Sequence, residues 1–244
     1  MHLIVGMPAY TNSVKMNTFN SLFFDLLKLA TNGWTIEIIN TISGAEIDTI
    51  RNKFVSYLAS HEKADELLMV DDDVCWHRDD VLRLLAADID TTRDIIGGLY
   101  PKRSEFIEYP FDPLKDDQGG MRVDPNNGLI ECRHMPAGFM RVPKGTAKHL
   151  IEEHPELQYD AVFSDMEPQG YPVYSLFEKI WEHNEVTGMK QRSSEDVSFC
   201  KRVTAAGGSI YCHPDIAMGH VGHKCFKGVA PRGNRPEYNH ESTS

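Results

Sequence analysis

The sequence predicts an α/β protein: a single domain with an open, mixed, mostly parallel sheet flanked by helices. Short apolar runs alternate with amphipathic segments through the first hundred residues. Such alternation of strand and helix implies parallel strands joined by right-handed crossovers. The length of 244 residues and the hydrophobic content of 41% are sufficient for one core of this kind.

The expected elements follow one another closely. In the first half, apolar runs rich in β-branched residues predict strands at 2–7, 34–41, 66–70 and 94–99. Helical spacing of apolar residues predicts helices at 12–31, 45–61 and 79–87. In the second half, the expected strands are 129–135, 139–142 and 209–212, and the helices are 145–153 and 194–206. Residues 101–127 predict a long excursion, and Phe177 and Trp181 are expected in the core.

The net charge and the spacing of the cysteines argue against several classes of protein. The chain has 25 Lys and Arg against 36 Asp and Glu, whereas proteins that bind nucleic acid by neutralising phosphates carry the opposite balance. The five cysteines include no C-x-x-C pair, so neither a disulfide framework nor a standard zinc site is predicted. The N-terminal apolar run is too short for a signal peptide. We therefore expect a cytoplasmic protein.

Asp71, Asp72 and Asp73 directly follow the strand expected at 66–70. Like charges this close raise one another's pKa unless a cation offsets them. Mn²⁺ and Mg²⁺ bind carboxylate oxygens and share their remaining positions with phosphates and water. Ligands of open α/β sheets bind outside the carboxyl ends of the strands. The pattern thus predicts a Mn²⁺ or Mg²⁺ site; a solvated acidic loop is the alternative.

The segment ELLMVDDDV resembles the strand and D-x-D signature of GT-A fold glycosyltransferases, especially the family-2-like group. Further segments resemble motifs of that family in the same order: Pro8-Ala9-Tyr10, Ile50-Arg51-Asn52, Pro136-Ala137-Gly138-Phe139-Met140 and Ser194-Glu195-Asp196. Each motif is short, and their order over residues 3–224 carries the match. The resemblance implies a GT-A fold and a nucleotide-sugar donor, with UDP the expected nucleotide.

On the donor side, the resemblance implies that Asp71 contacts the nucleoside and that Asp73 binds the metal, with Asp72 facing the donor or the loop. Asp71 is also a candidate metal ligand. It also assigns the nucleotide to the turn Pro8-Ala9-Tyr10 and to Arg51. Gly138 would line the donor sugar and acceptor sites. Lys102, which with Arg103 follows a strand end, is a candidate to meet the diphosphate or an anionic acceptor.

On the catalytic side, an inverting transfer needs a carboxylate that accepts the proton of the attacking hydroxyl. The resemblance assigns this role to Asp196, and Glu195 would orient the acceptor or be the base itself. The alternative is that both acids only complement a helix macrodipole. The resemblance also makes His220 a further metal ligand, with His223 second; neutral imidazole binds Mn²⁺ well.

We divide the chain into a glycosyltransferase domain, 1–224, and a polar tail or lid, 225–244. Residues 1–100 form the nucleotide-binding half and 101–224 the acceptor and catalytic half. The segment GGLYPKR and the small size also resemble glycosyltransferases of bacteriophages and large DNA viruses, which implies the host cytoplasm and, as acceptor, a glycan or a hydroxymethylated DNA base. A metal-dependent nucleotidyltransferase and a non-catalytic nucleotide- or carbohydrate-binding module are the alternatives, and the stereochemistry of transfer stays open.

Overall fold

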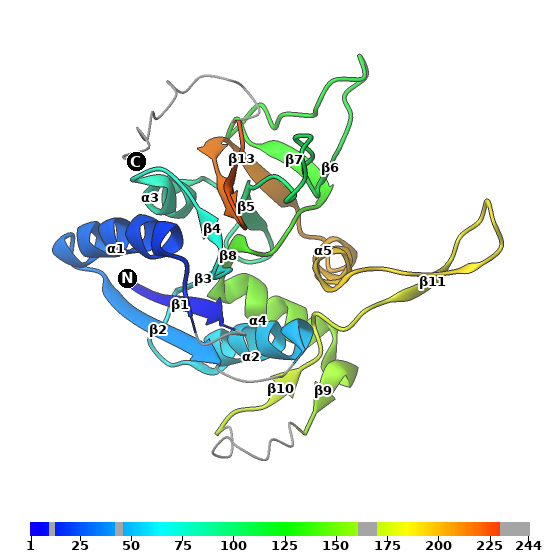
Figure 1. Cartoon of the computed structure of the whole chain (residues 1–244). Helices are drawn as coiled ribbons and strands as arrows, with labels where there is room; N and C mark the ends of the chain where they lie inside the picture. The colour runs from blue at the N-terminus through cyan, green and yellow to red at the C-terminus, as the bar shows by residue number, and fades with distance from the viewer. Residues whose placement is uncertain (10–12, 42–45, 161–169, 230–244) are drawn as a thin grey trace.

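The computed structural model describes residues 1–9, 13–41, 46–160 and 170–229. Its centre is an eight-stranded sheet with the order β2-β1-β3-β8-β5-β13-β7-β6 (Figure 1). The strands are β1 (His2–Pro8), β2 (Thr35–Thr41), β3 (Glu66–Val70), β5 (Ile95–Leu99), β6 (Asp112–Pro113), β7 (Ile130–His134), β8 (Phe139–Pro143) and β13 (Ile210–Ala217). β7 and β8 run against the other six. The predicted single-domain, mostly parallel α/β fold is confirmed.

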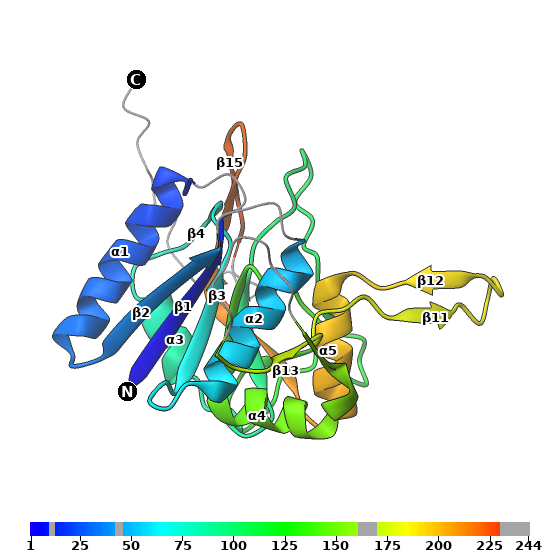
Figure 2. The same cartoon turned by 90° about the horizontal axis from the view of Figure 1, so that it is seen from below.

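Helices cover both faces of this sheet (Figures 1 and 2). They are α1 (Met16–Thr31), α2 (Ile47–Ser60), α3 (Asp80–Ala86), α4 (Lys144–Glu153) and α5 (Glu195–Ala205), with a short 3₁₀ turn at Pro155–Leu157. One core cluster joins the sheet to α2, α4 and α5, and a second joins it to α1 and α3. Leu3 and Val5 belong to the second core and Ile4 to the first, because successive side chains of a strand point to opposite faces.

Three smaller sheets lie beside the main one. β14 (Gly219–Val221) pairs with β4 (Val74–Cys75) and β15 (Cys225–Lys227), so the chain segment after β13 returns to the segment after β3. β9 (Gln158–Tyr159) pairs with β10 (Val173–Tyr174). β11 (Trp181–His183) and β12 (Lys190–Arg192) form a hairpin that projects from the body of the molecule (Figure 2).

The hairpin corrects one prediction. Phe177 is fully buried and stacks on Phe199 with ring centroids 4.1 Å apart, but Trp181 is 61% exposed. The prediction for Trp181 was wrong because the chain leaves the body of the molecule there; the guanidinium carbon of Arg192 lies 5.5 Å from the centroid of its ring. Two further differences are smaller. β13 runs to Ala217, beyond the expected 209–212, and the excursion 101–127 contributes β6 to the main sheet.

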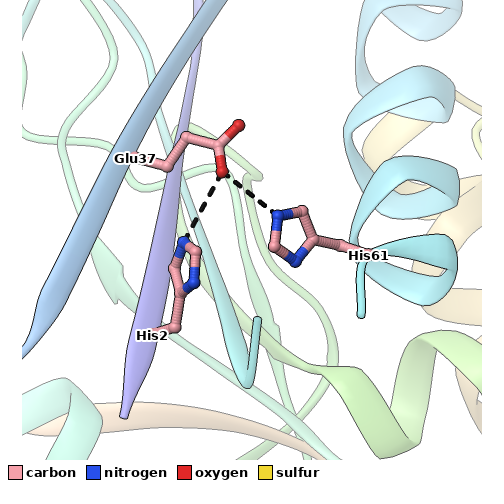
Figure 3. Close-up of side chains that lie close together, drawn as sticks. All are labelled: His2, Glu37 and His61. Carbon is pink, nitrogen blue, oxygen red and sulfur yellow. Dashed lines mark ion pairs between the residues drawn. The ribbon is translucent and has the colours of Figure 1, made fainter. Parts of the chain in front are cut away.

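His2 on β1, Glu37 on β2 and His61 after α2 lie close together, and both rings face the Glu37 carboxylate (Figure 3). The Glu37 carboxylate accepts from the Tyr57 hydroxyl at 2.8 Å and lies 3.3 Å and 3.5 Å from Nε2 of His61 and His2. Nδ1 of His61 accepts the backbone amides of Lys63 and Ala64, so the proton of the neutral ring is on Nε2. In this form the protonated Nε2 of His61 faces Glu37 and does not offer a lone pair to a metal.

Within the described residues, no helix combines the length and the apolar character that a membrane crossing requires.

Candidate active site

The site residues lie at one edge of the main sheet, where β3 and β5 end and where β8 and α5 begin. Asp71 to Asp73 follow β3, and Tyr100 to Arg103 follow β5. β8 is antiparallel to both strands, so its beginning, preceded by Gly138, lies at the same edge; Val70 pairs with Phe139. Glu195 and Asp196 open α5, whose N-cap Ser194 accepts the amide of Val197. The ends of parallel strands are where open α/β sheets bind ligands.

Arg51, from α2, is the centre of this site. Its side chain is only 4% exposed, and its guanidinium pairs with Asp71 Oδ1 at 3.0 Å, with Glu195 Oε1 at 3.3 Å and with Asp196 Oδ1. A buried guanidinium needs such partners because desolvation of an unpaired charge is costly. The structure thus brings together Asp71, which the sequence assigned to the donor, and the Glu195-Asp196 pair, which it assigned to the acceptor and the general base.

The pKa of Asp196 is raised to about 6. Burial is the largest cause; Arg51 opposes it by favouring the carboxylate, and the negative charges of Glu195 and Asp71 raise the value again. The macrodipole at the start of α5 favours the charged form as well. A carboxylate with a pKa near the working pH suits a general base, since it is ionised yet can hold a proton.

Gly138 lets the chain pass close to Asp71. A Cβ added there would lie 2.3 Å from Oδ2 of Asp71 and 2.4 Å from the hydroxyl of Tyr100. The Gly138 amide donates to the Tyr100 hydroxyl at 3.2 Å, the hydroxyl donates to Asp71 Oδ2 at 3.4 Å, and the Asp71 amide donates to the Gly138 carbonyl at 2.9 Å. Only glycine fits this approach.

Asp73 and His220 face each other at the predicted metal position. Oδ1 of Asp73 lies 3.4 Å from Nε2 of His220, and β14 is held beside the aspartate by the Val221 amide, which donates to the Asp73 carbonyl at 2.7 Å. Nδ1 of His220 lies 3.0 Å from the Pro101 carbonyl. A carbonyl only accepts, so this nitrogen carries the proton. Burial, as the largest cause, lowers the pKa of His220 and favours the neutral ring.

In the neutral ring, the Nε2 lone pair of His220 points toward a carboxylate oxygen. Two acceptors at this distance repel each other unless a cation lies between them, and a ring whose other nitrogen donates to a carbonyl is the usual form of a metal ligand. Asp73 and His220 therefore fit a divalent cation. Asp71 turns instead to Arg51 and Tyr100, and the His223 ring packs against Phe226.

The remaining predicted residues lie around this centre. Arg103 pairs with Asp73 Oδ2, whereas Lys102 pairs with Glu108 at 3.0 Å. Burial and the charge of Asp71 raise the pKa of Asp72, and its carbonyl accepts the Lys15 amide at 2.9 Å. Pro8 and Ala9 are buried at the end of β1. Tyr10 lies outside the described residues.

The role of Tyr100 was not predicted from the sequence. Its hydroxyl connects Gly138 to Asp71, and its ring meets His220 edge-on at 5.1 Å between centroids. Burial, followed by the charge of Asp71, raises the pKa of this phenol, so it remains a donor. Its position directly after a predicted strand at the ligand-binding edge was the available signal.

Solved structures with a fold similar to that of this chain include A197 from STIV and GalNAc-T7. A197 from STIV matches with a TM-score of 0.53 and 14% identity, over 98% of this chain and 100% of A197. GalNAc-T7, solved with UDP, GalNAc and Mn²⁺, matches with a TM-score of 0.51 and 11% identity. The fold is GT-A.

The GT-A match with GalNAc-T7 covers 90% of this chain and 44% of that one. Likeness at these identities concerns the fold alone, because one fold hosts many functions. No protein-family model matches the sequence, and no curated protein matches it.

Proposed function

We propose that the chain is a metal-dependent glycosyltransferase that moves a sugar from a nucleotide sugar, with UDP the expected nucleotide, to a hydroxyl acceptor. The observation that carries the proposal is that Asp73 lies opposite Nε2 of His220, the ring nitrogen that carries no proton. It lies at the carboxyl edge of a GT-A sheet, the edge that also carries the partly buried carboxylate of Asp196. The GT-A neighbour solved with UDP and Mn²⁺ supports the same ligand class.

Asp73 and His220 would hold Mn²⁺ or Mg²⁺, which when bound supplies positive charge to the diphosphate leaving group. Asp71 is held by Arg51 and Tyr100, so its carboxylate keeps one orientation toward the nucleotide. Gly138 keeps the strand backbone close to this aspartate and free of a side chain.

Asp196 would take the proton of the attacking hydroxyl. Its Arg51 partner stabilises the ionised form, and burial makes proton uptake possible near neutral pH. Glu195, in contact with the same guanidinium, would orient the acceptor. This assignment applies to an inverting transfer. The acceptor, a glycan or a hydroxymethylated DNA base, and the cytoplasmic location stay predictions.

Isothermal calorimetry tests the proposal. UDP should bind in the presence of Mn²⁺ and bind much more weakly after chelation, and Asp73→Asn should remove the Mn²⁺ dependence. A panel of UDP-sugars should then yield free UDP with an acceptor. A nucleotidyltransferase would instead transfer UMP, and a non-catalytic module would bind without turnover. UDP affinity that is indifferent to Mn²⁺ and Mg²⁺ would reject the proposal.

A further inference from the structure

We propose that Arg103 competes with the divalent cation for Asp73, so that metal binding is weak until the diphosphate of the donor draws the guanidinium away. This inference rests on the proposed function, because it needs a cation at Asp73 and a diphosphate beside it. Arg103 then acts as a positioning residue that links metal binding to donor binding.

The two oxygens of the Asp73 carboxylate have different partners. Oδ1 faces His220 at 3.4 Å, and Oδ2 pairs with the guanidinium of Arg103. A guanidinium stays charged at every relevant pH. Arg103 therefore neutralises Asp73 at the place where the cation is expected, and each must weaken the other's hold on the carboxylate.

Arg103 is attached loosely, unlike the other arginine of the site. Its side chain is 45% exposed and pairs with one carboxylate of the cluster, whereas Arg51 is 4% exposed and pairs with three. An ion pair whose guanidinium is this exposed holds only weakly. The stem of Arg103 passes over Gly222 in the turn between β14 and β15, where an added Cβ would come within 3.2 Å of its Cδ. Arg103 can therefore leave Asp73, and Arg51 cannot.

A diphosphate offers Arg103 a better partner than a single carboxylate, because a guanidinium binds phosphate oxygens in pairs. The neighbouring Lys102 is turned to Glu108, so Arg103 is the cation that follows β5 and faces the aspartates. When the donor accepts the guanidinium, Asp73 is free for the metal. Donor and metal then strengthen each other's binding by the same factor.

The test compares Arg103→Met with wild type by calorimetric titration of Mn²⁺, first without nucleotide and then with UDP. Without nucleotide, the dissociation constant for Mn²⁺ should fall by about three- to tenfold in the variant. The factor by which UDP strengthens Mn²⁺ binding should become smaller. The matched control is Arg133→Met, which removes an exposed arginine paired with Asp112 and has the same change of charge.

The control should leave both Mn²⁺ affinities at the wild-type values. Suppose that UDP binding by the wild type depends on Mn²⁺ but that Arg103→Met binds Mn²⁺ no more tightly than the wild type does. This result would overturn the role of Arg103 and leave the proposed function intact. Absence of Mn²⁺ binding by wild type in the presence of UDP would reject both. An unchanged urea midpoint for Arg103→Met would show that the comparison concerns folded protein.

Discussion

Arg51 on α2 forms an ion pair with Asp196 at the start of α5, across 145 positions of the chain. The same guanidinium holds Asp71 at the end of β3. One buried charge therefore sets the distance between the aspartate cluster of the donor side and the candidate base. Displacing either carboxylate would leave the guanidinium short of partners in a desolvated position.

Removing Arg51 should destabilise the protein. In Arg51→Met, three carboxylates lose their common partner, and we expect the free energy of unfolding to fall by about 3 kcal/mol. Urea unfolding at pH 7 measures it. Arg133→Met, at an exposed pair with Asp112, should change it by no more than about 0.5 kcal/mol. Similar values for the two variants would show that Arg51 is not a structural link.

Asp196→Asn should abolish transfer while the donor still binds. The amide keeps the size of the side chain and removes the base, so we expect kcat to fall by about 10²–10⁴-fold. Calorimetry of UDP with Mn²⁺ should give nearly the wild-type affinity. Unchanged turnover would mean that another group accepts the proton, and Glu195→Gln would then be the next variant to assay.

The pH dependence of transfer by the wild-type protein should follow the same carboxylate. The pKa of Asp196 is raised to about 6, and a base acts when it is unprotonated. We therefore expect kcat/KM to increase with pH up to about 6, to level off above it, and to fall about tenfold per pH unit below it. A profile that is flat from pH 5 to pH 8 would contradict this assignment.

Gly138→Ala should damage the site without exposing the core. The new Cβ would meet Asp71 and Tyr100 at less than 2.5 Å, so one of them must move, and we expect kcat/KM to fall by about tenfold or more. Gly170→Ala is the control, since no atom of the described residues lies within 4 Å of its added Cβ. Equal activity of the two alanine variants would mean that this close approach is unimportant for the reaction.

His220→Ala should weaken Mn²⁺ binding by about tenfold or more, because one of the two proposed ligands is lost. His223→Ala should have little effect, since that ring packs on Phe226. Titration followed by the electron paramagnetic resonance of free Mn²⁺ measures both. The opposite ranking of the two variants would move the metal to His223.

Much of the fold could be predicted because its strands are short apolar runs with clear ends. β1 and β3 could be recognised from such runs, and the aspartate cluster could be recognised because it directly follows β3. The sequence pattern within one element does not predict which side chains of other elements it will contact. The pairing of Arg51 with Glu195 and Asp196 depends on the strand order, and Trp181 is exposed because the hairpin that carries it projects from the body of the molecule.

The antiparallel insertion of β8 between β3 and β5 has a mechanical consequence. Both edges of this strand are hydrogen bonded, and Phe139 and Met140 fill opposite cores. A shift of the strand register by one residue would exchange these two side chains between the cores. The register of β8, and with it the position of the backbone beside Asp71, is therefore fixed by both neighbouring strands. We therefore expect insertions or deletions in the loops before β8 to leave the position of the Asp71 backbone unchanged.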